Sequence, residues 1–153
     1  MCTIRRATLD DVDELVQLRL KLFRETGDLI SDEPLPELIE ATRMYFLKNV
    51  PTEQFLAWIA EAEGRIIGMS GLVFFEKPPT DRNRYGVEAY IMNMYTVPEW
   101  RGKGVATSIL NELIHFVKTT KARRIWLHTT QDGRHVYERA GFIFTSQDME
   151  LVW

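Results

Sequence analysis

Residues 90–118 read YIMNMYTVPEWRGKGVATSILNELIHFVK, and the spacing of the apolar residues changes in the middle of this segment. Residues 87–97 are rich in aliphatic, aromatic and methionine side chains, which favours a largely buried strand. From Val105 onward the apolar positions fall three to four residues apart, which predicts a helix with one face in the core. Residues 98–104 form the turn that joins this strand to this helix.

The turn contains one proline and two glycines, Pro98, Gly102 and Gly104. The proline ends the strand, and a glycine lets the backbone approach a ligand closely because no Cβ stands in the way. The amides of residues 102–106 would be unpaired donors at the N-terminus of the helix, where the helix dipole also favours negative charge. The sequence therefore predicts an anion site at this turn, best suited to phosphate.

Two nucleotide-binding signatures do not fit this turn. The dinucleotide fingerprint G-x-G-x-x-G needs a third glycine where this chain has Thr107. The Walker loop needs serine or threonine after its lysine, and here Lys103 is followed by Gly104. Both nucleotide-binding interpretations are therefore excluded.

Two segments resemble motifs of the GNAT superfamily of N-acetyltransferases. RGKGVA at residues 101–106 resembles the family's acyl-CoA-binding motif, Gln/Arg-x-x-Gly-x-Gly/Ala. VYERAGF at residues 136–142 resembles the Leu-Tyr-Glu-x-x-Gly-Phe motif that the family carries near its C-terminus. The two motifs occur in the order and at the spacing that this family shows.

The rest of the pattern predicts a mixed α/β fold. We expect strands at residues 2–6, 55–62, 66–75, 87–97, 124–128, 142–145 and 149–153, and helices around residues 12–23, 38–46, 105–117 and 132–140. The second and third strands are joined through Glu63-Gly64, and the last two would form a closing hairpin. This order predicts a mostly antiparallel sheet of about seven strands with about four helices on its two faces, the fold that the resemblance also implies.

Composition limits the class of protein. The chain has 153 residues, 45% hydrophobic and 27% charged, so we expect one globular domain over residues 1–153. The formal charge of −3 argues against a nucleic-acid partner, and no apolar run is long enough for a membrane span. The single cysteine, Cys2, excludes an internal disulfide and offers no metal cluster. We expect a cytoplasmic protein, since the N-terminus has no signal-peptide core.

The resemblance implies that acetyl-CoA is the acyl donor and lies beside the strand at 87–97, where backbone groups bind its pantetheine arm. It assigns to the cofactor Met94, Tyr95, Thr96, Val97, Arg101, Gly102, Lys103, Gly104, Val105, Ala106, Arg134 and Tyr137. The side chains of Met94 and Val97 are expected in the core. Many family members carry an asparagine where this chain has residues 129–134, and Arg134 is our candidate for its replacement.

The resemblance also implies two catalytic roles. Tyr137, a phenol with an ordinary pKa near 10, would donate a proton to the leaving thiolate, whose thiol has a pKa near 8.5. The alternative is that Tyr137 is only a packed aromatic residue. Glu88 is the candidate base for the protonated amine, with a solvated position at the strand end as the alternative, and His128 is a second candidate. Asn93 either orients the substrate or satisfies buried backbone groups.

The acceptor side is the least specified. Asp28 and Glu33, with Asp32 and Glu37, are acidic residues in or next to the loop after the first helix, and they either attract a cationic amine or are simply solvated. We expect transfer of an acetyl group to a primary amine of a small molecule, peptide or protein by direct attack in a ternary complex. The alternative is a non-catalytic acyl-CoA-binding or sensing module, which would not need Tyr137. A homodimer through the C-terminal strands would cover a sheet edge.

Overall fold

The computed structural model describes residues 1–29, 31, 35–145 and 147–153. In these residues the strands are β1 (Thr3–Arg6), β2 (Phe55–Ala62), β3 (Arg65–Glu76), β4 (Val87–Thr96) and β5 (Arg124–Leu127). The α-helices are α1 (Val12–Thr26), α2 (Pro36–Asn49), α3 (Val105–Lys118) and α4 (Arg134–Arg139), and 3-10 turns at Leu9–Asp11 and Pro98–Trp100 precede α1 and α3. Among these described helices, none has the length and apolar character needed to cross a bilayer.

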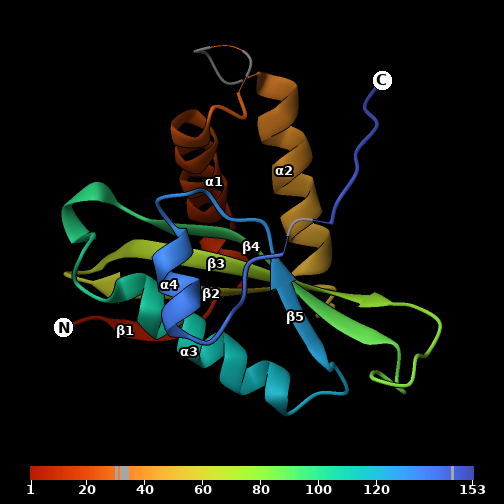
Figure 1. Ribbon diagram of the computed structural model, residues 1–153. Coiled ribbons are helices and arrows are strands. Elements are labelled where there is room, and N and C mark those ends of the chain that lie inside the picture. The colour runs from red at the N-terminus through yellow and green to blue at the C-terminus, as the bar shows by residue number, and fades with distance from the viewer. Residues whose placement is uncertain (30, 32–34, 146) are drawn as a thin grey trace.

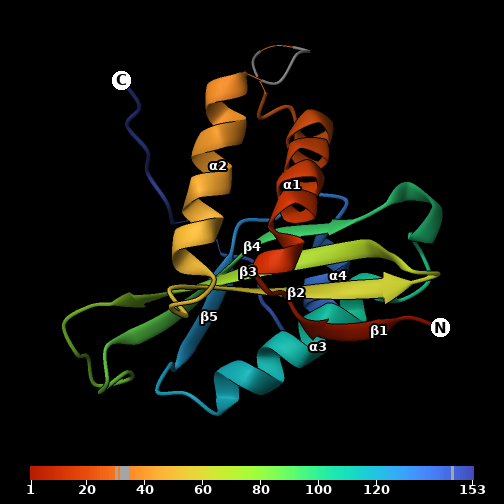
Figure 2. The same cartoon turned by 180° about the vertical axis from the view of Figure 1, so that it is seen from behind.

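The strands form one mixed sheet in the order β1-β2-β3-β4-β5. All neighbouring pairs are antiparallel except β4 and β5, which are parallel. Helices α1 and α2 cover one face, and α3 covers the other (Figures 1 and 2). The alternation of side chains along β2 explains these two layers: the ring of Phe55 packs 5.0 Å from that of Phe46 in α2, whereas that of Trp58 packs 5.2 Å from that of Phe116 in α3.

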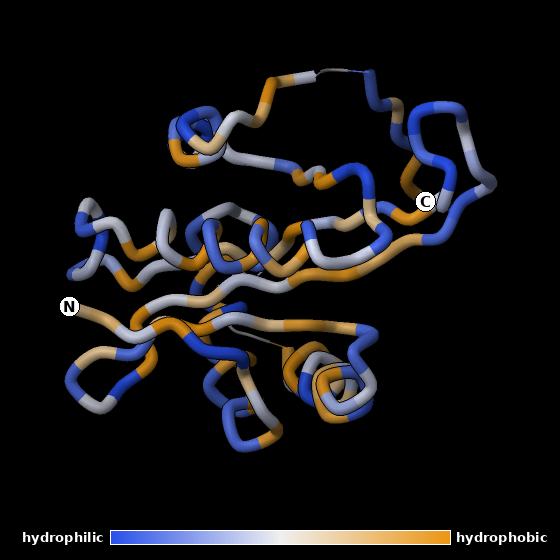
Figure 3. Tube along the Cα trace, turned by 90° about the horizontal axis from the view of Figure 1, so that it is seen from below, coloured by the Kyte–Doolittle hydropathy of each residue, from blue (hydrophilic) through white to orange (hydrophobic). Residues whose placement is uncertain are grey.

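Helix α3 packs on the sheet through the face that the sequence predicts. Its buried residues are Val105, Ile109, Leu110, Leu113 and Val117. A Cβ on Gly68 of β3 would lie only 2.9 Å from Val105 Cγ1, so the missing side chain lets α3 approach the strands closely. Figure 3 shows the strand layer between the helices, with the hydrophobic residues concentrated along the strands. This packing holds the N-terminus of α3 against the end of β4.

The C-terminal hairpin predicted from the sequence is not formed. The described residues 142–145 and 147–153 have no regular secondary structure, and the end of the chain runs away from the sheet (Figures 1 and 2). Ile143, Met149 and Trp153 are 86%, 100% and 103% exposed. Two short strands are marginal unless one face is buried, and these side chains bury almost nothing. The described sheet therefore has five strands. The homodimer expected through the C-terminal strands stays a prediction.

Candidate active site

The strands β4 and β5 pair only over the first part of β4. The parallel ladder runs from Glu88 to Ile91, and beyond it no described strand pairs with that edge of β4. We call this point the strand fork. The register of β4 against β3 also shifts here, and Asn93 adopts a φ of +55°, a left-handed conformation that asparagine tolerates better than most residues. The backbone of residues 93–97 therefore lies along an edge without a neighbouring strand.

The side chains along this edge belong mainly to the core, as expected. Tyr95, Val97 and Val105 are buried, and Met94 and Ala106 are half-buried. Thr96 Oγ1 is also buried and has no hydrogen-bond partner among the described residues. The groups left for a ligand at this edge are thus backbone groups.

The turn after β4 exposes backbone donors. Gly102 and Gly104 have φ values of +72° and +81°, which glycine adopts without steric cost. A Cβ on either glycine would find no heavy atom of the described chain within 4 Å, so the space in front of both is open. In the described chain the amides of residues 102–107 donate to no other protein atom. Lys103 is exposed, with its Nζ 4.8 Å from the ring centroid of Trp100. The turn has the free donors and open surface that a phosphate group needs.

The side chain of Arg101 points back from this turn toward α1. Its Nε donates a hydrogen bond of 2.9 Å to the Thr96 carbonyl, and its guanidinium pairs with Glu25 of α1. Glu25 also accepts a hydrogen bond of 2.9 Å from the Tyr95 hydroxyl. Arg101 therefore holds the turn against α1 and β4, and a phosphate at the turn would meet backbone amides rather than this guanidinium.

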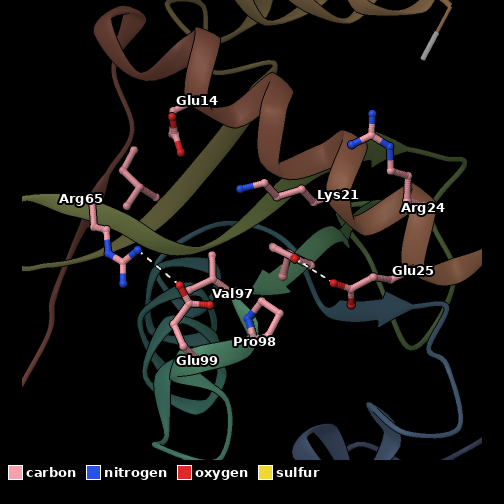
Figure 4. Close-up of a pocket in the computed structure, with 10 residues that line it drawn as sticks. Glu14, Lys21, Arg24, Glu25, Arg65, Val97, Pro98 and Glu99 are labelled. Atoms are coloured by element: carbon pink, nitrogen blue, oxygen red, sulfur yellow. Dashed lines mark hydrogen bonds and ion pairs between the residues drawn. The ribbon is translucent and has the colours of Figure 1, made fainter. Parts of the chain in front are cut away.

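A cavity of about 430 Å³ lies on the α1 side of the end of β4 (Figure 4). Its charged lining residues have both signs: Lys21, Arg24 and Arg65, and Glu14, Glu25 and Glu99. Arg65 and Glu99 form an ion pair of 3.3 Å within it. Because these charges balance, the cavity has no clear preference for an anion. We therefore place the candidate site at the turn and the strand fork, where the free backbone donors lie.

Helix α4 carries two of the predicted cofactor residues. Tyr137 is buried and packs edge-on against Phe142, with ring centroids 5.9 Å apart. Burial raises the pKa of Tyr137 to about 12, with a further contribution from the negative charge that Tyr90 of β4 would carry. Arg134, at the start of α4, pairs with Glu138 one turn later.

Glu88, the predicted base, lies at the opposite end of β4 from the turn. Its Oε2 lies 2.9 Å from Lys77 Nζ and 3.2 Å from Arg124 Nη1. Burial raises the pKa of Glu88, but the hydrogen bond from Lys77 and the charge of Arg124 outweigh it and lower the pKa below its usual value. Asn93 is five residues further along the strand, roughly 17 Å away. A paired carboxylate of lowered pKa is a weak base, so this geometry does not favour the catalytic role.

The acidic loop is described only in part. Asp28 follows α1, is exposed, and accepts a hydrogen bond from the Thr26 hydroxyl. Glu33 and Asp32 lie outside the described residues. The predicted attraction of an amine therefore depends, in the described chain, on Asp28 and on Glu37, which is exposed in the first turn of α2.

The sequence interpretation missed Arg19, which projects from α1 toward the strand fork. Its Nη1 donates to Oδ1 of Asn93, and its guanidinium carbon lies 4.3 Å from the ring centroid of Phe23. The sequence does contain a signal for it. Arg19 is four residues after Leu15 and four before Phe23, in the apolar face of an amphipathic helix, where a charged residue is unusual. Asn93 therefore binds a side chain of α1, a role that the sequence interpretation had not considered.

Sequence comparison supports the motif assignment. The chain matches the acetyltransferase (GNAT) family over residues 14–142. It is 25% identical, over 92% of its length, to an uncharacterized N-acetyltransferase of Methanocaldococcus jannaschii, and it spans 60% of that protein. It is also 26% identical, over 91% of its length, to the uncharacterized N-acetyltransferase YjgM of Escherichia coli, of which it spans 80%.

Solved structures share the fold described above. A predicted acetyltransferase of Clostridium acetobutylicum, crystallised with acetyl-CoA, has a TM-score of 0.88 and 33% identity, over 99% of this chain and 96% of that chain. A GCN5-related N-acetyltransferase of Ralstonia eutropha has a TM-score of 0.84 and 22% identity, over 99% of each chain. The family match extends from α1 past α4 and so includes both motifs. The chain belongs to the GNAT family of acetyltransferases.

Proposed function

We propose that residues 1–153 act as one domain that transfers the acetyl group of acetyl-CoA to a primary amine, by direct attack in a ternary complex. The observation that carries this proposal is the turn at the N-terminus of α3. There the free amides of residues 102–107 face an open surface next to the strand fork. Acetyl-CoA supplies a pyrophosphate that suits these donors and a thioester carbonyl that is open to attack.

The backbone at the strand fork is suited to hold the rest of the cofactor. Residues 94–97 would bind the pantetheine arm as an added strand, because that edge of β4 has no described neighbour. Amides at this edge would also donate to the thioester oxygen as it gains negative charge. Tyr95 and Val97 position these amides through their buried side chains.

Tyr137 would stabilise the departing sulfur through a hydrogen bond. With its pKa raised to about 12, the phenol remains protonated at every working pH. Complete proton transfer to a thiolate, whose thiol has a pKa near 8.5, would be unfavourable by about 5 kcal/mol. We therefore assign Tyr137 the role of hydrogen-bond donor to the sulfur, with the final proton arriving from water.

On the acceptor side, Asp28 and Glu33 would attract the ammonium form of the amine. An alkyl amine has a pKa of about 10 and must lose a proton before it attacks. We assign Glu88 to stability rather than to this step, because its two ion pairs hold it as a carboxylate at the far end of β4. His128 remains the candidate base; its Nδ1 lies 3.0 Å from the Tyr90 hydroxyl.

The test combines calorimetric titration of acetyl-CoA with a screen of amines in which release of free CoA thiol is measured. Turnover of any amine, with the acetylated product identified by mass spectrometry, supports the enzyme. Binding of acetyl-CoA without turnover across the panel favours the alternative, an acyl-CoA-binding or sensing module. Absence of acetyl-CoA binding would overturn both.

A further inference from the structure

Arg19 holds a positive charge in a half-buried position between α1 and the sheet. It lies on the buried face of α1, with Phe23 on one side of its guanidinium and Asn93 accepting one of its hydrogen bonds. Burial lowers the pKa of Arg19, an effect that the charges of Tyr45 and Asp28 only partly offset. The pKa of a free arginine is so high that the residue remains a cation in this position.

This cation lacks a close counter-charge in the described part of the chain. Among residues 1–29, 31, 35–145 and 147–153, no carboxylate lies within 4 Å of the guanidinium. Asp28 is exposed and accepts a hydrogen bond from Thr26. A guanidinium has five N–H donors, and the hydrogen bond to Asn93 involves only one of its three nitrogens. Arg19 is therefore a half-buried, partly desolvated cation with donors left for another group, an arrangement that favours an anionic ligand.

The position of Arg19 relates this donor to the proposed chemistry. Asn93 lies two residues beyond the last pair of β4 and β5, at the start of the strand fork. Arg19 approaches it from α1, whereas the phosphate turn begins α3 on the opposite face of the sheet. An acceptor that attacks the acyl group at residues 94–97 from the side of α1 and α2 would pass close to this guanidinium.

We propose that Arg19 binds an anionic group of the acceptor, a carboxylate or a phosphate, so that the substrate is an amine that also carries an anion. The inference rests on the proposed function, since it concerns the acceptor of that reaction. Asn93 orients the guanidinium through its amide oxygen, and Phe23 supports it from the side. Asp28 and Arg19 then present opposite charges, which suits the two ends of a zwitterionic acceptor.

The test uses amines that differ only in the anion. For the carboxylate, lysine is compared with cadaverine; for the phosphate, glucosamine 6-phosphate is compared with glucosamine. The wild-type protein should show a KM at least about 10-fold lower for the member of a pair that carries the anion. Whichever pair shows the preference identifies the anion.

Two variants of Arg19 separate ligand binding from a structural role. Arg19→Gln removes the charge but keeps an amide donor for Asn93, and it should raise the KM for the anionic acceptor about 10- to 100-fold. The KM for the member of each pair that lacks the anion, and the affinity for acetyl-CoA, should not change. Arg19→Lys should recover part of the loss. Arg24→Gln, an exposed arginine on the same helix, is the matched control and should leave every KM unchanged.

The result that overturns the inference is distinct from failure of the proposed function. Turnover in which Arg19→Gln raises the KM of both members of a pair equally, or of neither, leaves the acetyltransferase standing and reduces Arg19 to a structural residue. If no amine is turned over, calorimetry of the CoA-saturated protein with lysine and glucosamine 6-phosphate decides the point. Binding that Arg19→Gln weakens supports the anion site, and binding of neither compound overturns it.

Discussion

The two ends of β4 belong to one strand but differ in what they leave unpaired. At the Glu88 end, β4 pairs with both β3 and β5, and the charged carboxylate forms ion pairs with Lys77 and Arg124. At the Asn93 end, no described strand pairs with the β5 side of β4, and the backbone is bulged. The difference teaches that a carboxylate on β4 can be fully used in ion pairs, whereas a break in backbone pairing leaves groups free for a ligand, which is why we propose the site at that end.

The largest effect is expected from a substitution that blocks the turn next to the Asn93 end of β4. Gly104→Val would place a branched side chain in the space in front of the turn, where the pyrophosphate of acetyl-CoA would lie. We expect the affinity for acetyl-CoA, measured by calorimetry, to fall by at least about 100-fold, because a single steric block displaces several charged hydrogen bonds. A Cβ meets no heavy atom within 4 Å there, so the fold should survive.

Gly27→Val is the matched control for backbone strain. Gly27 follows α1 with a φ of +80°, against +81° for Gly104, and a Cβ there also meets no heavy atom of the described residues within 4 Å. Both variants should lose a similar amount of stability, about 1–2 kcal/mol, from the left-handed conformation. Only Gly104→Val should lose acetyl-CoA affinity, and equal affinities in the two folded variants would remove the phosphate site from the turn.

The second prediction concerns the proposed hydrogen bond from Tyr137 of α4 to the sulfur. Tyr137→Phe keeps the ring against Phe142 but removes the donor, so kcat should fall about 100-fold while the free energy of unfolding changes by about 1 kcal/mol or less. Because burial raises the pKa of Tyr137 to about 12, the phenol stays protonated up to pH 10. The ratio of wild-type to variant kcat should therefore be constant from pH 7 to pH 10. Equal kcat values would leave Tyr137 as a packed aromatic.

The smallest effect is expected at the Glu88 end of β4, where the strand pairs on both sides. Glu88→Gln should leave kcat unchanged and cost about 1 kcal/mol of stability at pH 7, since it removes two ion pairs of a largely buried carboxylate. The pKa of Glu88 is lowered in the folded state, so its contribution is present above the unfolded pKa, near 4.3, and is lost as the pH falls through the folded value. Urea unfolding at pH 7 and at a series of lower pH values should show the difference shrink as the pH falls below the unfolded pKa.

Glu76→Gln, which changes an exposed carboxylate at the end of β3, is the control for this substitution. It should alter neither stability nor kcat. A large loss of kcat in Glu88→Gln alone, with the fold intact, would restore Glu88 as the base and would blur the distinction between the two ends of β4.

Much of the fold was predictable because its signals are local. The run at Phe55–Ala62 and the hairpin at Glu63-Gly64 depend on side-chain alternation and on a short turn, and both form as expected. The C-terminal runs have similar strand propensity, yet the described parts of residues 142–153 stay irregular. A strand needs a partner with a face to bury, and propensity does not supply one.

The sequence by itself determined the turn at Gly102 and Gly104 and the buried face of α3, because glycine conformation and helical spacing are properties of neighbouring residues. Only the tertiary structure decided the partners of Glu88 and Arg19. Glu88 is held by Lys77 and Arg124, and Arg19 reaches Asn93, 74 positions away in the chain. The charge of a side chain is written in the sequence, but its partner and its desolvation depend on which distant elements pack against it.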